Sequence, residues 1–348
     1  MNSFGENWTF TSFGESHGAA IGGVLDGVPA GLTIDLDLIR KELDRRAGRR
    51  EKDEGQCTTG VSPRAVREPD EVEWLSGVIE SDKETKDNVQ TQDESFVHRT
   101  SSLRTLGTPI AFLIRNKDAR PEDYEWLKHN YRVGHADRVY ELKYGIRDWR
   151  GGGRASARET AARVVAGCIA KQQLAAEGVT IHATLIQVGA ETDPSKFAQT
   201  IAAYQREGDS IGGIIECTIS GLPVGTGEPI FNKLQAELAF AIMSINGCKG
   251  FEYGTGFGGV TKSGSEINAI SGGIAGGISD GTDITFRCVF KPTASTPKAL
   301  TNVQSDKVQG TKVGRHDACI AVRAVPVVEA MAAMTVINVQ SDKVQGTK

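Results

Sequence analysis

A glycine-rich turn flanked by two arginines is the first stretch of this sequence whose composition predicts ligand binding. It reads "DWRGGGRASARET" over residues 148–160. Ser156 and Glu159 match the S-x-x-E pattern that opens a helix, and the unpaired N–H groups of a helix start attract anions. Arg150 and Arg154 add cationic donors beside glycines that let a ligand approach the backbone. A capped helix start with incidental arginines is the simpler alternative, but a cap does not require three glycines. The stretch therefore predicts an anion site.

Three histidine-containing turns could supply acid–base chemistry near neutral pH. They are "GESHG" with His17, "GHADR" with His135, and "GRHDAC" with Asp317 after a histidine. A free histidine titrates near pH 6.5, and a positioned acid or base speeds a reaction by roughly 10²–10⁴-fold. For each of them the alternative is a solvated histidine in a polar turn.

Two further motif matches fail on their context. "GESHG" fits the G-x-S-x-G nucleophile elbow of serine hydrolases, which would make Ser16 the nucleophile, but the following "AAIGGVLDG" favours a strand over a helix. "GTGFGG" at 254–259 fits the dinucleotide-binding pattern, but it follows a helical segment and precedes a non-helical one. A serine hydrolase is therefore a remote alternative, and the dinucleotide-binding fold is rejected.

The bulk composition is that of a soluble globular protein and argues against several other classes. The chain has 348 residues, 39% hydrophobic and 24% charged, with a net charge of -4, which argues against a general nucleic-acid or membrane-surface binder. Six scattered cysteines without a C-x-x-C pair favour reduced thiols over zinc or disulfides. The N-terminus shows no secretion signal, and no apolar run approaches the roughly 20 residues of a membrane span. We therefore expect a cytoplasmic location.

Periodicity places these motifs on a mixed set of helices and strands. Helices are predicted at 35–46, 155–177, 232–246 and 325–337, the last with Pro326 near its start, and strands at 7–18, 19–31, 107–116 and 213–225. Residues 81–102 are polar and predict an exposed excursion. The segment "NVQSDKVQGTK" occurs at 302–312 and again at 338–348, which indicates a copied tail, not a repeat fold.

The ordered motifs resemble the chorismate synthase family over most of the chain. The resemblance is carried by "SFGESHG", "GTPIAFLIRN", "GHADRVYELKYGIRDWRGGGRASARETAARV", "AIMSINGCKGFEYGTGF", "GGIAGGIS", "KPTAS" and "GRHDACIAVRAVPVVEAMAAM". It implies an α+β fold, a β-α-β sandwich with internal duplication, as one domain over 1–337 that assembles into a homotetramer. It also implies a lyase (EC 4.2.3.5) of the shikimate pathway, which removes phosphate from 5-enolpyruvylshikimate 3-phosphate by anti 1,4-elimination. The family requires reduced FMN, with NADPH as a candidate reductant.

The resemblance also assigns roles to individual residues. His17 would supply a proton to the reduced flavin, His135 would protonate the leaving phosphate, and Asp317 would help the flavin act as the base. Arg46 and Lys52 would bind the substrate or a reducing nucleotide. Contacts to FMN carry over to Arg154, Ala155, Ser156, Asn246, Gly247, Gly276, Lys291, Pro292, Thr293, Ala294, Ser295 and Arg315.

Several departures from the family pattern bear on activity. Ala155 stands where the family has serine, and the segments between Gly189 and Glu207 and over 264–277 are shorter than usual. Closure over an active site depends on such loops. The alternative function is therefore a flavin- or anion-binding homologue that does not catalyse.

Overall fold

The computed structural model describes residues 1–49, 69–81, 102–132, 134–267, 271–294, 296–298 and 317–340. Several predictions fall outside these ranges: those for Lys52, Ser295 and Arg315, nearly all of the excursion at 81–102, and the first copy of the repeated segment. The chain has mixed helix and sheet, as the α+β prediction requires.

The N-terminal half forms a five-stranded antiparallel sheet in the order β1-β2-β3-β8-β5. Its strands are β1 (Ser3–Phe4), β2 (Thr9–Phe13), β3 (Ala20–Asp26), β8 (Ile110–Arg115) and β5 (Val72–Ser76). Ile110, Phe112 and Ile114 alternate along β8 and are fully buried, so this face of the sheet contributes to the core. A small second sheet pairs β4 (Thr33–Asp35), β7 (Ser102–Thr105) and β6 (Val78–Glu80).

The C-terminal half forms a four-stranded antiparallel sheet in the order β11-β14-β10-β9. Its strands are β11 (Cys248–Tyr253), β14 (Ile284–Phe290), β10 (Gly213–Ser220) and β9 (Thr180–Val188). In β10, Ile215, Cys217 and Ile219 are fully buried and alternate with partly exposed polar residues. This sheet therefore also has one core face and one outer face.

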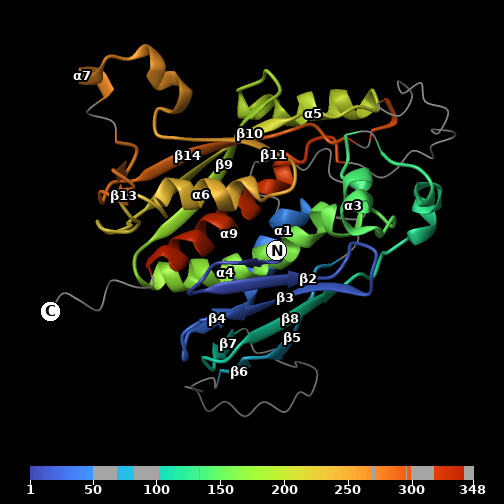
Figure 1. Cartoon of the computed structure of the whole chain (residues 1–348), viewed down its shortest axis with the longest axis horizontal. Helices are drawn as coiled ribbons and strands as arrows, with labels where there is room; N and C mark the ends of the chain where they lie inside the picture. The colour runs from blue at the N-terminus through green and yellow to red at the C-terminus, as the bar shows by residue number, and fades with distance from the viewer. Residues whose placement is uncertain are drawn as a thin grey trace, which may run out of the picture.

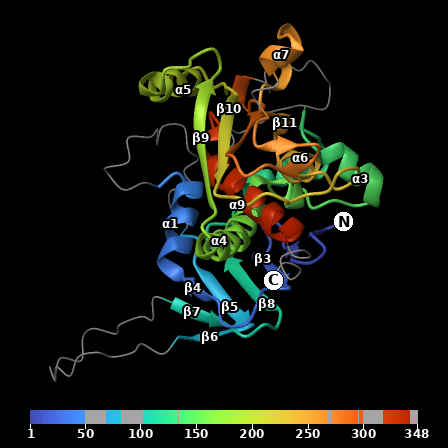
Figure 2. The ribbon, with the colours of Figure 1, turned by 90° about the vertical axis from the view of Figure 1, so that its left-hand side faces the viewer.

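A layer of helices lies between the two sheets, as Figures 1 and 2 show. It consists mainly of α4 (Thr160–Ala176) and α9 (Ala321–Gln340), with α1 (Leu36–Ala47) beside them. Helix α9 packs against α4, α1, β9 and β10, and α4 also packs against β3. A Cβ added at Gly167 of α4 would lie 2.2 Å from the Cβ of Ala330, so the glycine lets the two helices cross closely.

Of the remaining elements, α6 (Leu234–Met243) packs against α9 and β11 in the helical layer, and the others surround the layers. The helices are α3 (Asp137–Tyr144), α5 (Phe197–Arg206), α6 (Leu234–Met243) and α7 (Gly264–Ile267), and the 3-10 helices are η1 (Pro121–Lys128), η2 (Gly153–Ala155), η3 (Ala157–Glu159), η4 (Pro194–Lys196) and η5 (Gly256–Thr261). Strands β12 (Ile274–Ala275) and β13 (Ile278–Ser279) form a short hairpin.

Helix α9 corrects two statements made from the sequence. It begins at Ala321, so Pro326 lies at the sixth helical position and not at the first. Its 20 residues are also long and apolar enough to cross a membrane, contrary to the expectation that no run approaches that length. Most of the helix is buried inside the protein, which identifies it as a core helix that is apolar on every side because neighbours surround it.

The end of α9 is tied to the start of the chain. The side-chain oxygen of Asn338 accepts hydrogen bonds from the backbone N–H groups of Glu6 (2.7 Å) and Asn7 (3.1 Å). The first three residues of the second repeated copy, 338–340, are thus helical and form part of the fold.

A buried ion cluster fixes α9 against its neighbours. Glu329, which is 1% exposed, accepts hydrogen bonds from Arg45 of α1 at 2.9 and 3.1 Å and from Lys171 of α4 at 2.6 Å. The backbone N–H of Ala183 in β9 donates to the same carboxylate at 2.9 Å. Burial raises the pKa of Glu329, but its hydrogen bond with Arg45 and the charge of Lys171 outweigh that effect and lower it. The carboxylate of Glu329 is therefore ionised, and it connects α9 with α1, α4 and β9.

Candidate active site

The three glycines of the sequence motif form a turn that packs between two histidines. Gly151, Gly152 and Gly153 have φ angles of 61°, 90° and 53°, in the left-handed region that glycine adopts without strain. A Cβ at Gly151 would lie 2.3 Å from Cδ2 of His17, and one at Gly152 would lie 2.8 Å from Cε1 of His135. Glycine is therefore required at these positions for two reasons: a side chain would collide with the histidines, and the backbone has positive φ. The turn also brings both predicted histidines close together.

His17 lies in the turn between β2 and β3. It is 8% exposed, and its Nδ1 accepts a hydrogen bond from the backbone N–H of Arg120 at 3.1 Å. Tyr124 of η1 packs edge-on against the imidazole, with 4.8 Å between ring centroids. Ser16 is followed by the strand β3, so the helix that a nucleophile elbow needs is not there. The serine hydrolase alternative loses its structural basis.

His135 lies just before α3 and is held by a carboxylate that the sequence analysis did not select. Its Nδ1 is 2.9 Å from Oδ1 of Asp137, the first residue of the helix, which is 3% exposed. Arg132 donates to both oxygens of Asp137, at 2.8 Å from Nε and 2.8 Å from Nη2. Burial raises the pKa of Asp137, but these hydrogen bonds and charges outweigh it and lower the pKa far below its usual range. Asp137 is thus ionised and orients the imidazole.

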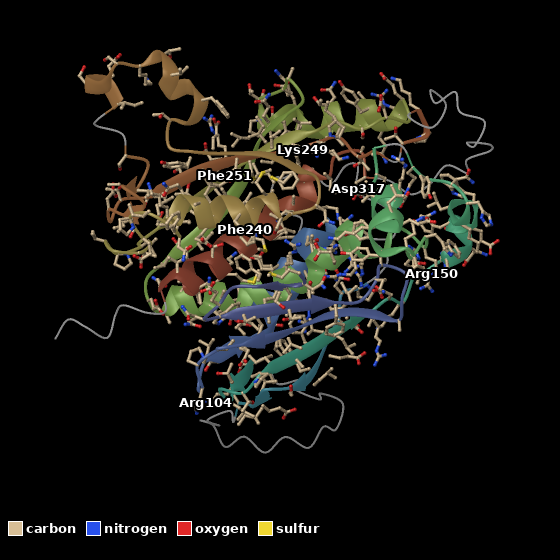
Figure 3. The ribbon with its side chains drawn as sticks, viewed as in Figure 1. Arg104, Arg150, Phe240, Lys249, Phe251 and Asp317 are labelled. Carbon is tan, nitrogen blue, oxygen red and sulfur yellow. The ribbon has the colours of Figure 1, made fainter. Side chains whose placement is uncertain are left out.

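A cavity of about 500 Å³ opens beside His135. Four cationic side chains contribute to its wall: Arg154, Arg163, Lys249 and Lys291, and Glu159 is the acidic one. The other lining residues are Met1, Asn2, Gly134, His135, Ala136, Tyr140, Ala155, Ser244, Asn246 and Gly247. Figure 3 labels Lys249 on β11 and Arg150 at the glycine turn. The charge of this wall suits an anionic ligand.

Several predicted cofactor contacts meet at this cavity. Arg154, Ala155, Asn246, Gly247 and Lys291 all line it. Nδ2 of Asn246 donates to the carbonyl oxygen of Ala155 at 3.0 Å, and Nζ of Lys291 donates to the carbonyl oxygen of Gly134 at 3.0 Å. These two hydrogen bonds connect the glycine turn with the segment after α6, and the segment after β14 with the loop that carries His135. Together these segments form one wall of the cavity.

Other predicted contacts lie close to the cavity or away from it. Pro292, Thr293 and Ala294 follow Lys291, and Oγ1 of Thr293 is buried without a hydrogen-bond partner among the described residues. Ser156 caps η3 by accepting from the backbone N–H of Arg158, whereas Glu159 pairs with Arg163. The predicted capping box is therefore half formed, and α4 begins at Thr160, later than predicted, because η2 and η3 occupy the residues before it.

Gly276 lies in the β12–β13 hairpin, apart from the other predicted contacts. The carbonyl oxygen of the next residue, Gly277, accepts a hydrogen bond from the backbone N–H of Leu234 at the first residue of α6. Asn246 lies three residues beyond the other end of that helix, whose ten residues rise by about 15 Å. This structure therefore does not bring Gly276 to the cavity.

Arg46 and Asp317 belong to a buried ion cluster behind the cavity wall. Arg46 is 2% exposed and donates to Thr160, to the carbonyl oxygen of Ala157 and to Asp70. Burial is the main reason that its pKa is lowered to about 9. Its side chain therefore holds α1 to the start of α4 and does not face the cavity.

Asp317 lies four residues before α9, near the centre of the molecule in Figure 3. Arg323 connects it to Arg46, since it donates to Oδ2 of Asp317 at 2.6 Å and to the carbonyl oxygen of Arg46 at 2.9 Å. A void of about 10 Å³ next to Arg46 and Arg323 shares Asn246 with the larger cavity. The cluster thus lies directly behind residues that line the cavity.

The sequence analysis did not select several residues that hold the predicted site residues in place. Asp137 stands two residues after His135 in "GHADR", a spacing that could have identified it. Arg132 and Arg163 pair with nearby carboxylates, Asp137 and Glu159, which the sequence motifs also contain. Tyr124 carries no local signal, because its partner His17 lies far away in the sequence.

Comparison with known proteins gives one consistent result. Residues 8–340 match a family model described as chorismate synthase. A chorismate synthase of Christiangramia forsetii is 44% identical over 96% of this chain and 95% of its own length, and one of Bacteroides thetaiotaomicron is 44% identical over 97% of each. A chorismate synthase crystal structure is similar in fold, with a TM-score of 0.68 and 25% sequence identity, over 97% of this chain and 92% of its own.

The alignment also bears on the departures in the sequence. The match to the Bacteroides thetaiotaomicron protein spans 377 positions against 348 residues in this chain, so at least 29 positions are gaps here. The relatives therefore carry segments that this chain lacks, in line with the shorter loops noted from the motifs.

Proposed function

Because the chain belongs to the chorismate synthase family and is a lyase, we propose that its cavity binds 5-enolpyruvylshikimate 3-phosphate beside reduced FMN. The enzyme would remove phosphate and a ring proton by anti 1,4-elimination, giving chorismate. One observation carries this proposal: a glycine turn in contact with two histidines at the edge of a cationic cavity.

The charge of the cavity supports the proposed substrate. The substrate carries two carboxylates and one phosphate, and Arg154, Arg163, Lys249 and Lys291 supply four cations to the wall. Arginine and lysine are the usual partners of carboxylates and phosphates in proteins. A single acidic side chain, Glu159, is paired with Arg163 at 3.0 Å, so it leaves the wall cationic overall.

The residues around the cavity also fit FMN. A volume of about 500 Å³ falls within the usual range of roughly 300–1,000 Å³ for cofactor and ligand sites. Oγ1 of Thr293, buried without a described partner, suits a hydrogen bond to a ligand. Arg154, Asn246, Gly247 and Lys291 would hold the cofactor with it. When bound, the reduced flavin supplies electron density that eases cleavage of the carbon–oxygen bond. Contacts from Ser156, Gly276, Ser295 and Arg315, and use of NADPH, stay predictions.

The proton chemistry is assigned to this chain's own side chains. His135 would give a proton from Nε2 to the departing phosphate, because Asp137 holds the opposite ring nitrogen and so aims Nε2 away from α3. Asp317, held by Arg323, would support removal of the ring proton from behind the wall. His17 would present Nε2 to the cofactor side of the glycine turn.

Anaerobic turnover of 5-enolpyruvylshikimate 3-phosphate with reduced FMN tests the function. We expect stoichiometric release of phosphate and chorismate, and no phosphate release under those conditions would refute the proposal. The gaps relative to the curated relatives favour one alternative, a homologue that binds flavin without catalysis. Tight binding of FMN with no turnover would support that alternative. Running the assay with and without NADPH shows whether the chain reduces its own flavin.

We further propose a homotetramer in the cytoplasm and a single domain built from two related halves. Exposed apolar side chains on α6 support assembly, since Phe240 is 62% exposed and Met243 45% exposed. Figure 3 labels Phe240 on that helix, where its ring stacks on Phe4 with 6.2 Å between centroids. Each half contributes one antiparallel sheet and helices to the common layer, which supports the duplication.

A further inference from the structure

The four cationic side chains of the cavity wall differ in how many of their donors the protein itself uses. Nη2 of Arg154 donates to Oγ of Ser12 at 2.6 Å, and Nζ of Lys291 donates to the carbonyl oxygen of Gly134 at 3.0 Å. Such a hydrogen bond fixes the head group and occupies a donor. Arg154 and Lys291 are therefore partly engaged before any ligand binds.

Arg163 is engaged more fully, whereas Lys249 on β11 has no described partner (Figure 3). Nη2 of Arg163 lies 3.0 Å from Oε1 of Glu159, and its Nη1 donates to Oγ of Ser244 at 2.7 Å. Within the described ranges, Nζ of Lys249 forms neither an ion pair nor a hydrogen bond. An ammonium group carries three donors. As far as the described residues are concerned, Lys249 keeps all three for a ligand in the cavity that it lines.

A β-bulge sets the direction of the Lys249 side chain. In the pairing of β11 with β14, Cys248 faces Phe290 and Gly250 faces Val289, so Lys249 is an extra residue without a counterpart. A Cβ at Gly250 would lie 3.0 Å from Cγ1 of Val289, so the glycine lets the two strands stay close at this point. Bulges occur next to active sites, where they redirect a side chain.

The same bulge explains why two side chains three residues apart both face the core. Cys248 is buried, and Phe251 packs against the core, where its ring lies 5.2 Å from that of Phe286. Side chains of a regular strand alternate with a period of two, so residues 248 and 251 would lie on opposite faces. The extra residue places both of them inside and leaves Lys249 on the outer side, at the cavity.

The position of Lys249 on the wall favours an anion that does not react. Lys291 bonds Gly134 beside His135, and its backbone N–H donates to the carbonyl oxygen of Gly247 at 3.0 Å. Lys249 follows two residues after Gly247, so contacts from the histidine loop reach Lys291 first and Lys249 after it. In the proposed function the leaving phosphate lies at His135. The phosphate of FMN, at the end of the ribityl chain, is an anion that the reaction leaves intact.

We propose that Lys249 binds the phosphate of the flavin and gives this protein a preference for FMN over riboflavin. Asn246 and Gly247, the predicted cofactor contacts just before it, would lie along the same molecule. This assignment rests on the proposed function, because it needs the flavin in this cavity. A charge-assisted hydrogen bond between ammonium and phosphate is roughly twice as strong as a neutral one, and riboflavin lacks the phosphate that makes it.

Fluorescence titration with oxidised FMN and with riboflavin tests the assignment without turnover. The ring contacts are common to both flavins, so the ratio of the two dissociation constants isolates the contribution of the phosphate. We expect Lys249→Met to weaken FMN binding by about tenfold or more, and riboflavin binding by less than about twofold. Equal loss for both flavins would overturn the proposal, because the substitution would then have disturbed the site and not a phosphate contact.

Two further variants test the charge and its location. Lys249→Arg keeps a cationic donor and should retain most of the preference for FMN. Lys262→Met removes another exposed lysine, which follows η5 and does not line the cavity, and should leave both affinities unchanged. If Lys262→Met lost the preference as far as Lys249→Met does, the effect would come from the net charge of the protein and a local contact would be refuted.

The substrate is the other anion of this site, and steady-state kinetics at saturating FMN separate it from the cofactor. We expect the KM for 5-enolpyruvylshikimate 3-phosphate to change less in Lys249→Met than the dissociation constant of FMN does. A rise in KM with an unchanged ratio of flavin affinities would assign Lys249 to an anionic group of the substrate and overturn the proposal.

Failure of the Lys249 contact and failure of the proposed function give different results. A wild type that turns over and prefers FMN, with a Lys249→Met variant that keeps the preference, refutes only the role of Lys249. A wild type that prefers FMN without turnover, with a variant that loses the preference, supports the role of Lys249 and refutes the activity. A wild type with no preference for FMN refutes both the cofactor and the contact.

Discussion

Adding one methyl group at Gly151 should disable the site while leaving the overall fold intact. In Gly151→Ala the new Cβ would lie 2.3 Å from Cδ2 of His17, and ordinary contact needs roughly 3.5 Å or more, so the ring or the turn must shift by about 1 Å. A misplacement of that size at a reacting group costs on the order of 10²-fold in rate. The left-handed φ of 61° adds about 1–2 kcal/mol, and overpacking adds about 1–3 kcal/mol.

The three neighbouring glycines provide a graded series. The nearest atom to an added Cβ is 2.3 Å away at Gly151, 2.8 Å at Gly152 and 3.3 Å at Gly153, while all three have positive φ. Loss of turnover should follow that order, with alanine at 153 the mildest. Gly178→Ala is the matched control, because Gly178 has φ of 81° and nothing within 4 Å of the added Cβ. It should lose about 1–2 kcal/mol of stability and keep full turnover.

Turnover under anaerobic conditions and urea unfolding of each variant measure the two effects separately. We expect Gly151→Ala to lose roughly 10²-fold in turnover and about 2–5 kcal/mol in the free energy of unfolding, remaining folded in the absence of urea. Turnover of Gly151→Ala within twofold of wild type would refute the contact between the turn and His17. Equal turnover losses at 151 and 178 would show that backbone strain alone is responsible.

Three further predictions rest on other contacts. Asp137→Asn should slow turnover by roughly 10²-fold or more because the neutral amide cannot accept from both His135 and Arg132 as the carboxylate does, with FMN affinity by fluorescence titration unchanged; wild-type turnover would contradict this. Glu329→Gln should lower the free energy of unfolding by about 3–5 kcal/mol at pH 7, since Arg45 and Lys171 lose their buried counter-charge. The pKa of Glu329 is lowered in the fold, so its contribution is present above its ordinary pKa of 4.5 and is lost as pH falls below it; the difference between variant and wild type in urea unfolding should shrink there, and a constant difference would rule this out. Ala155→Ser should tighten FMN binding by about 0.5–1.5 kcal/mol through one added hydrogen bond, and unchanged affinity would remove that idea.

The regular elements were predictable because burial patterns are local. Strands β3, β8 and β10 lie inside the predicted segments, since alternating apolar residues mark one buried face. The helix predicted at 35–46 is α1, with Asp35 as its N-cap. Boundaries at the site were less predictable: residues before Thr160 form 3-10 turns because the glycine turn, and not helix propensity, determines the backbone there.

The chemistry of the site was only partly predictable, because partners come from distant turns. His17, His135 and the glycine turn were selected from their own residue types, and the structure brings them together. The resemblance assigned Arg46 to the substrate or a reducing nucleotide, and in this structure Asp70 and the start of α4 enclose its side chain. No sequence pattern indicates that Arg120 donates its backbone N–H to His17.

The position of α9 in the chain has a consequence for folding during synthesis. This helix packs against α4, α1, β9 and β10, yet its first residue is 321 of 348. The first sheet ends at Arg115, so at roughly 5–20 residues per second about 10–40 s pass before Ala321 is synthesised. During that interval the strands of the second sheet are still being synthesised, and α4 lacks the helix against which it packs. The native core can close only after α9 has been synthesised, and a nascent chain stopped before Ala321 would lack the helix that lies between its two sheets.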